Sequence, residues 1–146
     1  MRYEGKKALS HARMEHAAEC LSAASSLLLS GNYKSAANRS YYAVFHAMRA
    51  VLAYDEIDMK KHSGVIAEFR RLYVKTGVFD GDMSKTISVL FDVRTESDYD
   101  DFFIISKEDV IQQAESAQYF LSKNEYLSAD EPTAWPWAYF FYPPDI

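Results

Sequence analysis

The chain has 146 residues, of which 49% are hydrophobic, and a formal net charge of −5. This length fits one domain with a single core. No run reaches the ~18 consecutive apolar residues of a membrane-spanning helix, and the first residues, MRYEGKK, lack the apolar stretch of a secretory signal. The single cysteine, Cys20, excludes an intramolecular disulfide and predicts a buried, inert thiol. We therefore expect a soluble cytoplasmic protein that does not associate with membranes.

The charge is distributed unevenly along the chain. Residues 1–75 hold 12 Lys/Arg and 7 Asp/Glu, a net +5, whereas residues 76–146 hold 4 and 14, a net −10. A basic half could contact phosphate. The alternative is that the two halves neutralise each other across the fold. On charge alone the pI of 5.3 favours that alternative, because nucleic-acid-binding domains commonly have a pI above ~9.

The first predicted helix has one apolar face, and glycine ends it. Gly31 tolerates the left-handed conformation that follows many helices, and Asn32 is suited to cap the next one. The face repeats at steps of three and four and consists of Met14, Ala17, Leu21, Ala24 and Leu28.

The second predicted helix, from Tyr33 to about Tyr54, is apolar on two faces and should lie at the centre of a bundle. Its small-residue face should allow another backbone to approach closely. The small face consists of Ala36, Ser40, Ala43, Ala47 and Ala50, and the larger one of Ala37, Tyr41, Val44, Met48 and Val51.

Three further helices follow, and we predict no strand. Ser63 should cap the third helix and Gly77 should stop it, Asp80 or Asp82 should cap the fourth, and Ser106 with Asp109 forms a capping box for the fifth. The predicted fold is an all-α, up-and-down bundle of about five helices. The apolar faces are Val65, Ile66, Phe69, Leu72 and Tyr73 in the third helix, Met83, Ile87, Leu90 and Phe91 in the fourth, and Val110, Ala114, Ala117 and Leu121 in the fifth.

The composition changes near residue 124. Residues 125–146 contain all four prolines, both tryptophans and no Lys or Arg. Proline opposes a regular helix, and leaving this much apolar surface in water is unfavourable. We therefore divide the chain into a bundle, 1–124, and an extended aromatic tail, 125–146, that docks on the bundle or on a second subunit.

A polar stripe on the second helix is a candidate binding surface for phosphate or a nucleotide. Arg39, Tyr42, His46 and Arg49 lie three to four residues apart on one helical face. Arginine with aromatic rings suits phosphate contact and base stacking. The alternative is a bundle boundary at which arginine stems cover apolar surface.

Arg94 continues the apolar face of the fourth helix and leads into the acidic, aromatic stretch VRTESDYDDFF, residues 93–103. A guanidinium that is partly removed from water needs partners, and Glu96, Asp98, Asp100 and Asp101 follow it. The spacing of these carboxylates matches no calcium loop, so we expect a solvated acidic turn and no metal site. With one cysteine, a thiolate zinc site is not expected either.

The histidines give weaker signals. His62 follows Lys60 and Lys61 at the start of the third helix, where a helix N-terminus attracts anions; the alternative is an exposed loop histidine. His11 and His16 show no clustered partners and receive no role.

The segments NRSYYAVFHAMRAVL, KKHSGVIAEFRRLYVKTGVFD and LFDVRTESDYDDFF together resemble the HEPN domain family, over about residues 5–123. The likeness is greatest to the branch with Ser-Tyr-Tyr-Ala-x-Phe-His-Ala on helix two and Arg-x-x-x-Asp-Tyr at the end of helix four. The resemblance implies a helical bundle that usually dimerises, with a site at the end of the fourth helix near the dimer seam.

The same resemblance implies an RNA-directed activity. Many family members are metal-independent ribonucleases with an arginine followed four to six residues later by histidine, and many are toxins paired with a nucleotidyltransferase that can adenylylate a tyrosine near the motif. Arg94 matches the arginine, but Tyr99, Asp100 and Asp101 occupy the positions where the histidine would fall. The candidate catalytic set is therefore Arg94, Tyr99 and His62, with His46 as another histidine that the fold could bring to Arg94. Glu96 and Asp98 would position Arg94.

Three functions remain open on these grounds. The first is an RNA- or nucleotide-directed protein of toxin–antitoxin type, acting without a cofactor. The second is a non-catalytic module that binds a nucleotide or a nucleotidyltransferase partner, since the family histidine is missing. The third is a purely structural homodimer in which Arg94 is a buried ion-pair residue.

Overall fold

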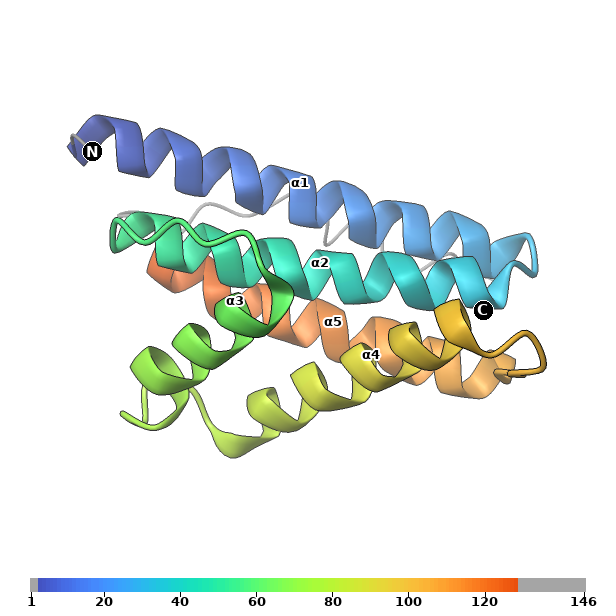
Figure 1. Cartoon of the computed structure of the whole chain (residues 1–146). Coiled ribbons are helices and arrows are strands. Elements are labelled where there is room, and N and C mark those ends of the chain that lie inside the picture. The colour runs from blue at the N-terminus through green and yellow to red at the C-terminus, as the bar shows by residue number, and fades with distance from the viewer. Residues whose placement is uncertain (1–2, 129–146) are drawn as a thin grey trace.

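Five α-helices form an up-and-down bundle in the computed structural model, which describes residues 3–128 and the side chains of 5–123 (Figure 1). No strand occurs within residues 3–128. The all-α prediction is confirmed. The helices are α1 (Tyr3–Leu29), α2 (Tyr33–Tyr54), α3 (His62–Phe69), α4 (Gly81–Tyr99) and α5 (Lys107–Ser128), with a short π-helical segment, η1 (Arg70–Val74), after α3.

Helix α2 is the centre of the bundle. It packs along α1 and α5, and α3 and α4 lie against its other side (Figure 1). Its small face is completely buried, which allows the close approach of neighbouring helices that the sequence predicts, and its larger face is buried as well. The fully buried members of the small face are Ala36, Ser40, Ala43, Ala47 and Ala50.

Most helix ends follow the local signals in the sequence. Gly31 and Gly77 adopt φ values of +79° and +81°, the left-handed region that glycine tolerates best. The Asp80 carboxylate accepts a hydrogen bond from the Met83 amide, and the Asp109 amide donates to Ser106 Oγ at 3.1 Å. Asn32 is the N-cap residue of α2 but makes no side-chain capping bond, because its amide donates to Ser30 Oγ instead.

The third predicted helix differs in two ways from expectation. Its N-cap is Lys61 and not Ser63, so His62 is the first helical residue. The helix also changes to the wider π-helical turn at Arg70. The first difference places His62 at the beginning of a helix that packs on α2.

Helix α4 includes the whole Arg-x-x-x-Asp-Tyr segment. It continues to Tyr99, so Arg94 and Asp98 share a helical face one turn apart, and the acidic run forms the last turn of the helix before it forms a loop. No described helix is long and apolar enough to cross a membrane. The predicted docking of the tail, 125–146, falls largely outside the described residues, and the division at 124 stays a prediction.

Candidate functional site

Arg94 joins α4 to α2. Its Nη2 donates to the Tyr42 hydroxyl at 3.2 Å, and its guanidinium carbon lies 5.5 Å from the ring centroid of Tyr41 and 5.6 Å from that of Tyr42. Both distances are within the ~6 Å at which a cation and an aromatic face attract. The two tyrosines of the Ser-Tyr-Tyr-Ala segment therefore form the surface on which the Arg94 guanidinium packs.

The Arg94 guanidinium stays accessible. Its side chain is 25% exposed, and Nη1 has no hydrogen-bond partner among the residues that the structure describes. Guanidinium offers five N–H donors in a planar fork, so donors remain for an incoming anion. Arg94 is thus neither sealed beneath side chains nor saturated by acidic neighbours.

Asp98 is the carboxylate that pairs with Arg94. Its Oδ2 lies 3.1 Å from Arg94 Nε, although the Nε–H does not point well enough at it to count as a hydrogen bond. Within the described residues, Glu96 is exposed and makes no ion pair with Arg94. Of the two predicted positioning residues, the helix geometry therefore brings only Asp98 to the guanidinium.

His62 lies on the other side of Tyr41. The Tyr41 hydroxyl and His62 Nδ1 are 2.5 Å apart, and the His62 ring stacks on Phe45 with centroids 4.1 Å apart. The ring is half-buried, which argues against the alternative of an exposed loop histidine. His62 and Arg94 therefore share one aromatic wall, with Tyr41 between them.

The protonation states in this wall follow from burial and charge. Burial, and then the Arg94 and Arg49 charges, hold the pKa of His62 below its usual range. Burial raises the pKa of Tyr41 to about 12, so its hydroxyl keeps its proton at neutral pH. In the tautomer whose Nδ1–H donates to the Tyr41 hydroxyl, Nε2 of the neutral imidazole is free to accept a proton.

Arg39 extends the site toward the start of α2. Its guanidinium carbon lies 5.0 Å from the Tyr42 ring centroid, so Tyr42 lies between two arginines. A shallow groove of about 450 Å³ opens beside it, between the first turns of α2 and the last turn of α4. The groove is lined by Leu27, Lys34, Ser35, Asn38, Arg39, Ser97 and Asp98.

Arg49, another residue of the predicted stripe, makes its ion pair with the loop between α2 and α3. Arg49 pairs with Asp58 at 3.0 Å, and Arg13 of α1 pairs with the same carboxylate at 2.8 Å. Hydrogen bonds from these two arginines hold the pKa of Asp58 below its usual range. These two ion pairs connect the loop of residues 55–61 to α1 and α2, so Arg49 helps to hold this loop in place.

His46 points toward α1. Its ring stacks on His16 with centroids 4.0 Å apart, so the expectation that His16 has no clustered partner is wrong. Burial, and then the charges of His16 and three arginines, lower the pKa of His46 to about 4. His46 is therefore neutral at pH 7, and its ring lies 6.0 Å from that of Tyr42.

Tyr99 is at the exposed end of α4. It is 85% exposed, and Phe102 and Ile104 in the following loop are each 89% exposed. Tyr99 does not share the aromatic wall of Arg94 and His62. Asp100 and Asp101 are exposed as well.

Sequence reasoning did not identify Tyr41, Phe45 and Asn38 as site residues. Tyr41 and Phe45 look like ordinary core positions, because they are buried, yet both contact His62. Asn38 accepts a hydrogen bond from Arg39 at 2.9 Å. The doubled tyrosine at 41 and 42, set beside the arginines at 39 and 49, was the available signal.

The comparisons with known proteins give the family. The HEPN domain family matches residues 10–127. The chain belongs to the HEPN domain family. A UPF0332 protein of Thermotoga maritima is 37% identical over 114 residues, which cover 78% of this chain and 86% of that protein. Two proteins named "Putative toxin" from Methanocaldococcus jannaschii are 33% and 36% identical, over 77% and 60% of this chain and 76% and 66% of theirs.

Proposed function

We propose that this HEPN protein is the toxin-like member of a two-protein pair and that it binds RNA or a nucleotide through the Arg94 site. The relatives named as toxins support the toxin-like role. The observation that carries the binding proposal is the partly exposed Arg94 side chain, whose guanidinium lies on two tyrosine rings and keeps Nη1 for a ligand. A planar guanidinium fork matches the oxygens of a phosphate.

The surroundings of Arg94 supply the other contacts that a nucleotide needs. Arg39 and Lys34 line the groove between α2 and α4 and add positive charge there, which suits a run of phosphates. The Arg39 guanidinium, which lies 5.0 Å from the Tyr42 ring centroid, provides a plane on which a base can stack. Asp98 competes with phosphate for Arg94 but also orients the guanidinium.

A ribonuclease reaction at this site would use His62 as the proton-transfer group. The 2′-hydroxyl of the substrate would lose its proton to the neutral imidazole and attack the adjacent phosphorus. The bond from phosphorus to the 5′-oxygen would break, and that oxygen would take up the proton that His62 had accepted. Arg94 would stabilise the negative charge of the phosphorane. The support is the shared wall formed by Tyr41, which contacts both groups.

The second candidate is a non-catalytic module that binds a nucleotide or a nucleotidyltransferase. The exposed hydroxyl of Tyr99 favours it, because a group 85% exposed at the end of α4 can be reached by a modifying enzyme. Adenylylation would join the tyrosine oxygen to the α-phosphorus of ATP and release pyrophosphate and the hydroxyl proton. The loop residues Phe102 and Ile104, exposed next to it, suit the seam of a homodimer or the surface of that partner.

One experiment separates these candidates. Purified wild type, Arg94→Gln and His62→Gln are incubated with single-stranded RNA in the presence of a chelator, and both cleavage and binding are measured. Cleavage that both substitutions abolish supports the ribonuclease. RNA binding that Arg94→Gln weakens, without cleavage by any of the proteins, supports the binding module. Equal behaviour of wild type and Arg94→Gln in both assays contradicts a role of Arg94 in binding or cleaving RNA.

A further inference from the structure

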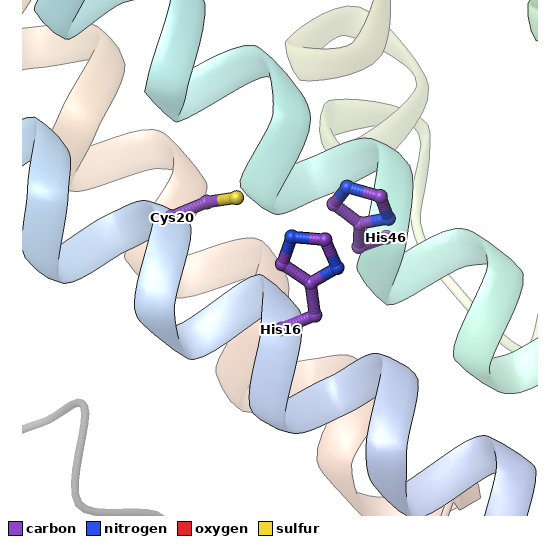
Figure 2. A group of neighbouring side chains, drawn as sticks. All are labelled: His16, Cys20 and His46. Carbon is purple, nitrogen blue, oxygen red and sulfur yellow. The ribbon is translucent and has the colours of Figure 1, made fainter.

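Three potential metal ligands converge on the contact between α1 and α2. His16 and Cys20 are four residues apart on α1 and so share a face, and His46 on α2 faces them (Figure 2). One donor atom from each residue, a ring nitrogen or the sulfur, lies within 4.8 Å of the other two. Neither the family resemblance nor the Arg94 site uses these three residues as a group.

We propose that His16, Cys20 and His46 bind one divalent transition-metal ion, for which zinc is the best fit. Two imidazole nitrogens and one sulfur form a donor set that suits zinc and discriminates against magnesium and calcium, which prefer oxygen. Three protein ligands leave a fourth tetrahedral position for water or a ligand. The site does not depend on RNA binding, so its test is independent of the proposed function.

The geometry needs a small adjustment. In a tetrahedral zinc site with Zn–N of ~2.0–2.1 Å and Zn–S of ~2.3 Å, neighbouring donor atoms are about 3.5 Å apart. Because the donor atoms lie within 4.8 Å of one another, they need to approach by at most roughly 1.3 Å to reach that spacing, a movement that side-chain rotation can supply. Because both helix backbones are fixed by the buried core, this adjustment has to come from the side chains.

The stacked histidines define how the site would close. Their rings are nearly parallel, at 18°, and a metal ion lies in the plane of each ring that ligates it, so one ring must turn out of the stack. His16 is exposed, whereas His46 is half-buried and Cys20 is only 3% exposed. His16 can turn without disturbing the core and is the residue that closes the site.

The charges around the site select its ion. Arg39 Nη1 lies 4.0 Å from Cys20 Sγ, and Arg13 and Arg49 act on His46. Glu19 is the carboxylate close enough to affect Cys20. The three arginines oppose a weakly held hard cation. Arg39 alone acts on the Cys20 thiol, where it favours the thiolate against the larger effect of burial. Binding converts the Cys20 thiol to a metal thiolate with release of one proton. The bond between the metal ion and the Cys20 sulfur must therefore supply most of the binding affinity for the metal.

Cobalt(II) tests the site because its bond to sulfur produces a charge-transfer absorption that imidazole or water ligands do not. The full chain, without a histidine tag, is stripped of metal with a chelator, kept reduced and titrated with Co²⁺. We expect one Co²⁺ per chain, a sulfur-to-cobalt band, and loss of that band on addition of Zn²⁺. Absence of the band in the wild type overturns the proposal.

Three variants make the test specific. His16→Ala, at an exposed position that is not needed for folding, should weaken Co²⁺ binding by roughly tenfold or more. Cys20→Ser, which keeps the size of the buried side chain, should remove the sulfur band. The matched control is His11→Ala on the same helix, which should bind like the wild type. A band that persists in Cys20→Ser, or equal weakening by His11→Ala and His16→Ala, contradicts the proposal.

Discussion

The Tyr42 hydroxyl accepts a hydrogen bond from Arg94 Nη2 at 3.2 Å, across 52 positions of the chain. This contact makes one site out of two separate sequence features, the arginine of the fourth helix and the polar stripe of the second. Arg39 on the same tyrosine ring extends the site along α2. In this arrangement Arg94 can bind a ligand in addition to its structural contacts.

Arg94→Ala should fold and lose about 1–2 kcal/mol of unfolding free energy. Its partner Asp98 is 42% exposed, and an exposed ion pair contributes at most ~1 kcal/mol, while each cation–π contact adds ~0.5–1 kcal/mol. Urea denaturation measures the difference. The control is Arg71→Ala, whose ion pair with Glu68 is on the surface, and which should change stability little. A loss of ~3–5 kcal/mol for Arg94→Ala would instead indicate a buried structural ion pair.

Tyr42→Phe should weaken RNA binding by about fivefold. The substitution keeps the ring next to Arg39 but removes the acceptor for Arg94 Nη2, and one hydrogen bond is worth ~1 kcal/mol. Fluorescence anisotropy with a labelled single-stranded RNA measures it. Tyr119→Phe on α5 removes a hydroxyl remote from Arg94 and should bind as the wild type does. If the two variants behave alike, Tyr42 does not orient the guanidinium.

Arg94→Gln should raise the pKa of His62. The Arg94 charge is one of the causes that hold this pKa below its usual range, after burial, so removing the charge moves the pKa toward ~6.5. Titration of the His62 ring protons by NMR measures the change, with the His11 signals as the internal reference. No change in the pKa of His62 would mean that the two groups do not share a site.

The same shift has a consequence for stability. Because the folded-state pKa of His62 is lower than the unfolded one, the unfolded chain binds the proton more readily. The contribution of His62 to stability is complete above about pH 6.5 and is lost as pH falls through the folded pKa. His62→Gln should therefore flatten the decline of unfolding free energy below pH 6.5, as measured by urea denaturation. An unchanged decline would mean that His62 titrates normally in the folded protein.

The exposed loop after α4 should hold two copies of the chain together. Phe102 and Ile104 are each 89% exposed beside Tyr99, and we expect the wild type to sediment as a dimer. Replacing both loop residues by Asp should give a folded monomer, because neither side chain is in the core. Val78→Asp, at a position 53% exposed before α4, is the control and should remain dimeric. A wild-type monomer, or a double variant that still dimerises, contradicts this surface.

Much of the fold follows from local signals in the sequence. The 3.6-residue periodicity identifies the apolar faces, as at Met14 and Leu21, and glycine or aspartate marks the helix ends, as at Gly31 and Asp80. These signals are strong because each depends on neighbouring residues in a single helix. The change to a π-helical turn at Arg70 has no such local signal.

The site is less predictable because it depends on the register between helices. His62 reaches Tyr41 only because residues 55–61 run back along α2, and Asp58 ties that loop to Arg13 and Arg49. The small residues of α2 predict a close approach of α1 but not which residues face each other, so the meeting of His16 with His46 could not be foreseen. Arg94 could be identified because its place on an apolar helical face is visible without knowledge of the register.

The affinity for single-stranded RNA of the wild type, Arg94→Gln and the surface control Arg71→Gln, measured by fluorescence anisotropy at two salt concentrations, tests the central claim most directly. We expect Arg94→Gln to bind roughly tenfold more weakly and with a shallower salt dependence, since one phosphate contact is lost, while Arg71→Gln stays within about twofold of the wild type. Equal affinities and equal salt slopes for the wild type and Arg94→Gln would contradict the account.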